Sequence, residues 1–253
     1  GGARVFEQDV DTWYLGAGLE GVFDAGQRTL YWDVNVAFSE NKAEQTNFGS
    51  YDIRNIALAL GDPAACAAVA GCTPLNIFGG PGTITPEMLA FISPVVRDRS
   101  KNELALITAN LSGSLFDLPA GSVDFAAGVE HRRLEGSYQP DALTVAGFYN
   151  GVPSLPTAGK YDVSELYAEF NVPLFANAEK GSRLDFTLAG RYSDYSTGIS
   201  EVTPKYGLRW QVAEELVLRA SFAEGFRAPS IGELFGSASR FDAQLDDPCT
   251  TPL

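Results

Sequence analysis

Apolar and polar residues alternate with a period of two along much of this chain. Between Asp11 and Phe23 most odd-numbered positions are apolar, and most even-numbered positions are polar or small. The apolar positions are Trp13, Leu15, Ala17, Leu19 and Phe23. This alternation predicts a β-strand with one apolar face. After a short turn at residues 24–27 the pattern resumes from Leu30 to Ser39, so the two segments are predicted to form a hairpin.

The same alternation recurs in later segments and brings the predicted total to eight strands. The further strands are predicted at residues 103–115, 123–132, 164–172, 184–192, 202–211 and 216–222. Short turns are predicted at residues 24–27, 117–121, 176–181 and 213–215, whereas two of the other links run to about 60 and 30 residues. The predicted fold class is therefore all-β and antiparallel, with tight turns at one end and mostly long loops at the other.

Strand length and the placement of aromatic residues favour a membrane setting. Strands of about 10 to 14 residues between short turns and long loops are typical of a transmembrane β-barrel. The apolar positions carry no charge through the middle of each strand, and aromatic residues lie near both ends: Phe23, Trp32 and Trp210, and Phe38, Tyr192 and Phe222. A soluble sandwich shows the same alternation, so a secreted soluble β-sandwich binding module remains the alternative.

Composition narrows the possible partners. The 253 residues are 45% hydrophobic and 11% aromatic, which is typical of an ordered protein. The net charge of −14 argues against a nucleic-acid partner, because phosphate contacts require clustered Lys and Arg. No stretch approaches the ~18 apolar residues of a membrane-spanning helix.

The long loop after Ser39 is predicted to form an ordered cap of short helices. Apolar residues at helical spacing lie between Ile53 and Leu60, and Asp62 and Thr85 each precede a proline, as capping residues do at a helix start. The glycines at residues 79–82 have no lysine beside them, so they do not predict a phosphate site.

Two of the three cysteines are close enough in sequence to pair. A disulfide between Cys66 and Cys72 would remove about 2.4 kcal/mol of unfolded-chain entropy and would indicate an oxidising compartment. Two buried free thiols are the alternative. Cys249 is left over, and its partner is expected downstream of this sequence.

Few residues suggest catalysis. The single histidine, His131, shares the apolar side of its strand, so an interfacial histidine is favoured over a Ser/His hydrolase of the outer membrane. Charged residues on the polar side are predicted to pair across strands in a wet lumen: Asp33, Glu165, Glu169, Asp185, Arg183, Arg191, Lys205, Arg209 and Arg219. We expect no enzymatic activity, no cofactor and no metal ion.

The segment at residues 218–235 resembles the strand-to-loop segment of TonB-dependent outer-membrane receptors. In that family a strand commonly ends in Gly-Phe-Arg-x-Pro, followed by Glu-Leu and an aromatic residue. The matching residues here are Gly225, Phe226, Arg227, Pro229, Glu233, Leu234 and Phe235. Residues 72–92, 123–133, 161–175 and 184–195 also resemble the family, so the likeness covers most of the chain.

This resemblance implies an active importer in the bacterial outer membrane, in contact with lipid. The expected substrate is an iron-siderophore complex, cobalamin or an oligosaccharide, and the TonB coupling protein is expected to bind a part of the receptor outside these residues. Residues 1–253 are expected to be a fragment of a single β-barrel domain, namely a partial barrel of about eight strands without plug or terminal strands. Four loop residues are predicted to contact the ligand: Tyr149, Asn150, Phe235 and Arg240.

Overall fold

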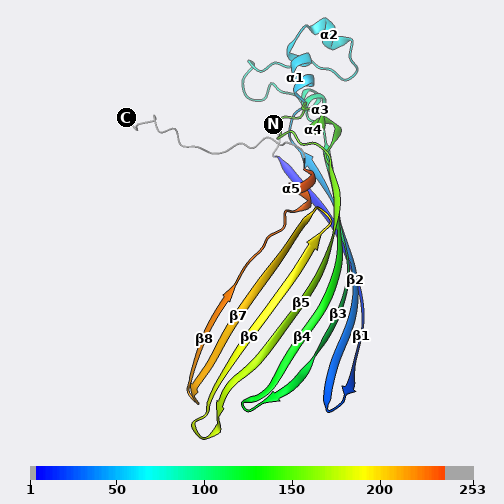
Figure 1. The fold of residues 1–253 in the computed structure, drawn as a ribbon. Helices are drawn as coiled ribbons and strands as arrows, with labels where there is room; N and C mark the ends of the chain where they lie inside the picture. The colour runs from blue at the N-terminus through cyan, green and yellow to red at the C-terminus, as the bar shows by residue number, and fades with distance from the viewer. Residues whose placement is uncertain (1–3, 237–253) are drawn as a thin grey trace, which may run out of the picture.

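The computed structural model describes residues 4–236, which form one antiparallel sheet of eight strands with small helices at one end (Figure 1). Each strand pairs with its neighbours in sequence, in the order β1 to β8. The strands are β1 (Val5–Ala25), β2 (Arg28–Phe48), β3 (Val96–Leu118), β4 (Gly121–Gln139), β5 (Thr157–Asn177), β6 (Ser182–Tyr195), β7 (Ile199–Ala213) and β8 (Leu216–Ala223). The predicted number and order of strands are confirmed. A β-sandwich needs a second sheet, and residues 4–236 form only one, so the sandwich alternative is wrong.

Several strands extend well beyond their predicted ends. Strand β2 continues from Ser39 to Phe48, and its Asn47 is still paired with Val96 of β3. Beyond Glu40 both sides of β2 carry polar residues, so the alternation that marks a strand is lost although pairing continues. The two long loops are therefore shorter than expected, at residues 49–95 and 140–156.

The sheet has an apolar face and a polar face, as the alternation predicted. Directly paired residues share a face, and the apolar face brings Trp13 within 5.0 Å of Phe38 and Tyr206 within 6.3 Å of Phe222, measured between ring centroids. Large side chains on this face are open to the surroundings, since Leu15 is 66% exposed. An apolar surface of this extent requires a non-aqueous environment.

Hydrogen bonds between side chains cross the polar face. The Tyr167 hydroxyl donates to Asn110 Oδ1 at 2.8 Å, and Asn110 Nδ2 donates to Asp33 Oδ1 at 2.7 Å. Strand β4 lies between Asn110 and Tyr167, and it carries Gly128 at that point. A Cβ at Gly128 would lie 2.4 Å from Asn110 Oδ1, so the glycine makes room for the hydrogen bond to pass over β4.

The two long loops form one folded cap above the sheet (Figure 1). Its helices are α1 (Ile53–Leu60), α2 (Pro63–Ala67), α3 (Pro86–Ile92) and α4 (Ala142–Val145). Asp62 and Thr85 cap α2 and α3 as predicted, and the predicted disulfide joins Cys66 to Cys72. Over residues 4–236, no helix is both long and apolar enough to cross a bilayer.

Candidate functional site

The segment after β8 continues toward the loop end of the sheet, as the brown ribbon leading to α5 shows in Figure 1, and it packs there on residues of the polar face. We call residues 224–236 the wedge; it contains the short helix α5 (Ile231–Phe235). Its apolar side chains pack on a cluster of wall residues that lie on the otherwise polar face. The wall residues are Leu134, Tyr161, Val163, Tyr195 and Ile199, and the wedge residues packed on them are Ala228, Ile231 and Leu234. Phe226 adds an edge-on ring contact with Tyr195 at 5.8 Å.

Two glycines provide the seat for the wedge. Gly136 of β4 and Gly159 of β5 are direct partners in the sheet, so at this place on the polar face no side chain stands between the wall backbone and the wedge. A Cβ at Gly159 would lie 2.1 Å from Cδ2 of Phe235, and one at Gly136 would lie 3.1 Å from Cδ1 of Ile231. Glycine inside a strand commonly marks such a close approach, and here it allows α5 to lie against the wall.

An ion pair and a capping box hold the wedge in shape. Arg227 donates two hydrogen bonds to the Glu233 carboxylate, at 2.9 and 3.0 Å. Glu233 also accepts from the backbone amide of Ser230, whose hydroxyl in turn accepts from the amide of Glu233. The hydrogen bonds from Arg227 and Ser230 hold the pKa of the Glu233 carboxyl at about 2, below its usual 4.5.

Backbone and side-chain hydrogen bonds fasten the two loops of the cap to each other. The amide of Tyr51 donates to Asn150 Oδ1 at 2.8 Å, and the amide of Asn150 donates back to the Tyr51 carbonyl at 3.0 Å. Tyr149 forms an isolated β-bridge with Asp52, the N-cap of α1. Two of the predicted ligand contacts, Tyr149 and Asn150, therefore lie at the junction of the loops.

Asp52 is the buried charged group at this junction, and it pairs with Arg54. Its carboxylate is buried and accepts from the Arg54 guanidinium at 2.9 Å, while the guanidinium lies 4.0 Å from the centre of the Phe148 ring. Burial opposes ionisation of Asp52, but the hydrogen bonds from Arg54 and from the amide of Asn55 outweigh it and lower the pKa of Asp52. The carboxylate thus links α1 to the second loop through Arg54 and Phe148.

Part of the predicted cross-strand pairing on the polar face is present: Glu165 pairs with Arg191 and Asp185 with Arg209. Glu165 of β5 is buried and accepts hydrogen bonds from Arg132 at 3.0 Å, Arg191 at 2.7 Å and Ser193 at 2.6 Å. Asp185 of β6 accepts from Arg183 of its own strand at 2.7 Å, and Arg209 of β7 lies 3.6 Å from it across the strand pair. These pairs hold neighbouring strands together on a face that is otherwise open to water.

His131 has neighbours that superficially resemble a hydrolase triad. Its Nδ1 lies 3.0 Å from Ser164 Oγ, and its Nε2 lies 3.8 Å from Asp162. Asp162, however, accepts two hydrogen bonds from Arg133, and the strands at this level pair on both sides through the row Ile107, His131, Ser164 and Asp194. Backbone amides engaged in these pairings are not available as an oxyanion hole, so the geometry favours the interfacial histidine.

Comparison with known protein families assigns the chain to one family. Residues 2–250 match the family model described as TonB dependent receptor-like, beta-barrel. The chain therefore belongs to the β-barrel domain of TonB-dependent receptors, which are transporters of the bacterial outer membrane coupled to TonB, and not enzymes. No curated protein matches the sequence. The apolar face of the sheet is thus the lipid-facing face, and the polar face is the lumen-facing face.

The predicted site residues fall into two separate groups. Tyr149 and Asn150 lie in the cap, whereas Phe235 and the family residues from Gly225 to Leu234 lie in the wedge; Arg240 is outside the described residues. Ligand binding by these residues stays a prediction. Sequence reasoning missed the glycine pair and the apolar wall cluster beneath the wedge. The available signal was a group of apolar residues on the polar side of β4, β5 and β6, close to Gly136 and Gly159.

Proposed function

We propose that the cap and the wedge form a ligand-gathering mouth for a receptor that imports a scarce nutrient. The substrate class is an iron-siderophore complex, cobalamin or an oligosaccharide, and transport is driven through TonB. The observation that carries this proposal is the position of the wedge on the lumen-facing face, where it stands at the entrance to the lumen.

The mouth offers two kinds of contact. Phe235 remains 40% exposed on the wedge after packing against Gly159, so part of its ring is free for a ligand. Tyr149 and Asn150 supply polar groups from the cap, and the Asn150 side chain is exposed. An exposed aromatic ring in the wedge together with polar groups in the cap suits any of the three proposed substrate classes. Arg240 is retained as a proposed contact from the sequence alone.

The proposed receptor is larger than the sheet. Strands β1 and β8 each have one edge without a partner among residues 4–236, and hydrocarbon does not tolerate free edges. We therefore propose that additional strands complete a barrel around these eight, with a plug and the TonB-contacting segment elsewhere in the same protein.

The test is uptake by cells that carry the full-length receptor. Cells with and without TonB are supplied separately with a radiolabelled ferric siderophore, cyanocobalamin and a maltooligosaccharide. We expect TonB-dependent uptake of one class, reduced several-fold by Phe235→Ala and by Tyr149→Ala. A matched control is Glu179→Gln in the short turn between β5 and β6, away from the mouth, and it should transport normally. Unchanged uptake in both mouth variants would contradict the proposed ligand contacts. If the cells take up none of the three compounds, the proposed substrate classes are wrong.

A further inference from the structure

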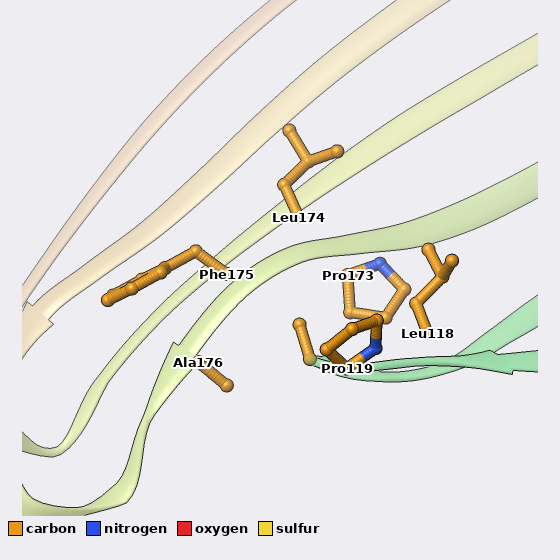
Figure 2. Close-up of a pocket in the computed structure, with 7 residues that line it drawn as sticks. Leu118, Pro119, Pro173, Leu174, Phe175 and Ala176 are labelled. Atoms are coloured by element: carbon orange, nitrogen blue, oxygen red, sulfur yellow. The ribbon is translucent and has the colours of Figure 1, made fainter.

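A cavity lies at the opposite end of the sheet from the mouth. Figure 2 shows it between the turn that joins β3 to β4 and the last residues of β5. Its volume is about 290 Å³, and its lining residues are Leu118, Pro119, Ala120, Pro173, Leu174, Phe175 and Ala176. We call this cavity the rim slot. None of its side chains carries a polar group.

The rim slot exists because the end of β4 next to its turn stays paired with β3 but not with β5. Strand β5 pairs with β4 only as far as Asn171, which is opposite Asp124, but it continues along β6 to Asn177. The flanking strands each carry a bulge near this level, one between Ser114 and Phe116 and one at Leu174. Bulges bend a strand and increase its twist, so the turn and β5 diverge and leave a gap.

The rim slot reaches the lipid-facing face through Phe175, whereas Pro173 and Ala176 lie on the lumen-facing side of β5. Phe175 pairs with Leu184, which pairs in turn with Trp210 and then Leu218, so four large apolar side chains form a row across β5 to β8. Trp210 belongs to the aromatic residues near the short turns, which in this class of barrel mark the periplasmic boundary of the membrane. The slot therefore opens where the acyl chains of the periplasmic leaflet approach their headgroups.

The walls of the slot are rigid. Pro119 and Pro173 have fixed backbone φ angles, and Pro173 is fully buried against the neighbouring strand. If the slot were empty, its lining atoms would lose dispersion contacts. A water molecule there would have no side-chain group to hydrogen-bond with. The slot is preformed and apolar, so it suits a flexible hydrocarbon chain.

We propose that the rim slot holds one acyl chain of a phospholipid from the periplasmic leaflet. Lipid tails are as apolar as leucine, so the hydrophobic effect does not distinguish the slot from bulk lipid. The difference comes from close packing between two prolines and two strands, which gives one lipid a longer residence than its neighbours. This inference depends on the membrane setting of the family and is independent of the imported nutrient.

Native mass spectrometry of the full-length receptor tests the proposal. The receptor is released from nanodiscs that contain phosphatidylethanolamine, phosphatidylglycerol and lipopolysaccharide, and the lipids that remain bound are identified. We expect a single phospholipid to persist. Ala120→Leu fills the slot and should abolish this retention, and Ala176→Leu fills it from the other strand if the turn variant fails to fold. Ala109→Leu adds the same side chain on the lipid-facing face opposite Val34, far from the slot, and should retain the lipid.

Three results would overturn the proposal. The first is a wild-type receptor that retains no lipid. The second is retention of lipopolysaccharide instead of phospholipid, because lipopolysaccharide belongs to the other leaflet. The third is equal retention in the filled variants and in Ala109→Leu, since the retained lipid would then lie elsewhere.

Discussion

The cap and the wedge both cover the loop end of the sheet, but different forces hold them. The cap is held by backbone hydrogen bonds, helix caps and the disulfide between Cys66 and Cys72, all within residues 49–95 and 140–156. The wedge has few backbone bonds to the wall; its apolar side chains lie on the wall cluster and on the pair Gly136 and Gly159.

The cap and the wedge therefore differ in which parts of the chain stabilise them. The cap is stabilised mainly by contacts within and between its own two loops, so changes in the wall beneath the wedge should leave it intact. The wedge depends on wall residues of β4, β5, β6 and β7 that precede residue 224 by 25 residues or more. A change in the wall should therefore release the wedge and spare the cap, and the following experiments on the full-length receptor test this expectation.

The largest expected effect is release of the wedge by Gly159→Ala. The added Cβ would collide with the Phe235 ring, and overpacking of this kind costs about 1–3 kcal/mol. Amide hydrogen exchange of α5 should rise by roughly 5- to 150-fold, while exchange in the cap stays unchanged. Gly190→Ala is the matched control, because a Cβ there meets nothing within 4 Å. Equal exchange in both variants would mean that Gly159 is not the seat.

The second effect is selective loosening of the cap by Cys66→Ser combined with Cys72→Ser. Loss of this small ring should cost about 2.4 kcal/mol of local stability, because the unfolded loop regains entropy. Hydrogen exchange should increase around α2 and leave α5 unaffected. Reductant should reproduce the change in the wild type and do nothing further to the double variant. Faster exchange in α5 of the double variant would show that the wedge and the cap are not stabilised independently.

A smaller change is expected from Asp52→Ala at the junction of the two loops. The variant loses the N-cap of α1 and the partner of Arg54, at a cost of about 1 kcal/mol. Exchange should rise in α1 and at Tyr149, which forms the bridge with residue 52. Asp62→Ala removes only the exposed cap of α2 and serves as the comparison. An effect confined to α1 would show that Asp52 does not couple the loops.

The smallest expected effect is a pH dependence of the wedge. The pKa of Glu233 is about 2 when the wedge is formed and 4.5 when the carboxyl is free, so its contribution is complete above about pH 4.5. That contribution is lost as the pH falls through about 2. The protection factor of the α5 amides, which is the intrinsic exchange rate at that pH divided by the observed rate, should therefore fall below pH 4.5 in the wild type, and Glu233→Gln should remove this dependence. The pair is exposed, so the change is modest. If the α5 amides of Glu233→Gln respond to acid as those of the wild type do, the pH dependence belongs to other titratable groups.

The strand pattern was readable because one side of each strand meets lipid. From Leu30 to Ser39 alternation identified β2, but from Glu40 to Phe48 both sides are polar and only pairing with β3 makes this part a strand. The cap helices were likewise predictable, because Asp62 and Thr85 satisfy helix-start amides within a few residues of themselves. The residues from Gly225 to Leu234 were recognised, but their packing was not.

The sequence by itself determined the alternating parts of the strands, their two faces, the helices α1 to α3 and the family, because each of these follows from neighbouring residues or from a local pattern. The tertiary structure alone decided where the wedge lies, since Gly159 and Phe235 meet only when β5 and α5 are both in place. It also decided that the rim slot exists, because the gap arises from unequal strand ends and two bulges. Contacts between segments distant in sequence depend on register and curvature, and no local alternation of apolar and polar residues encodes either of them.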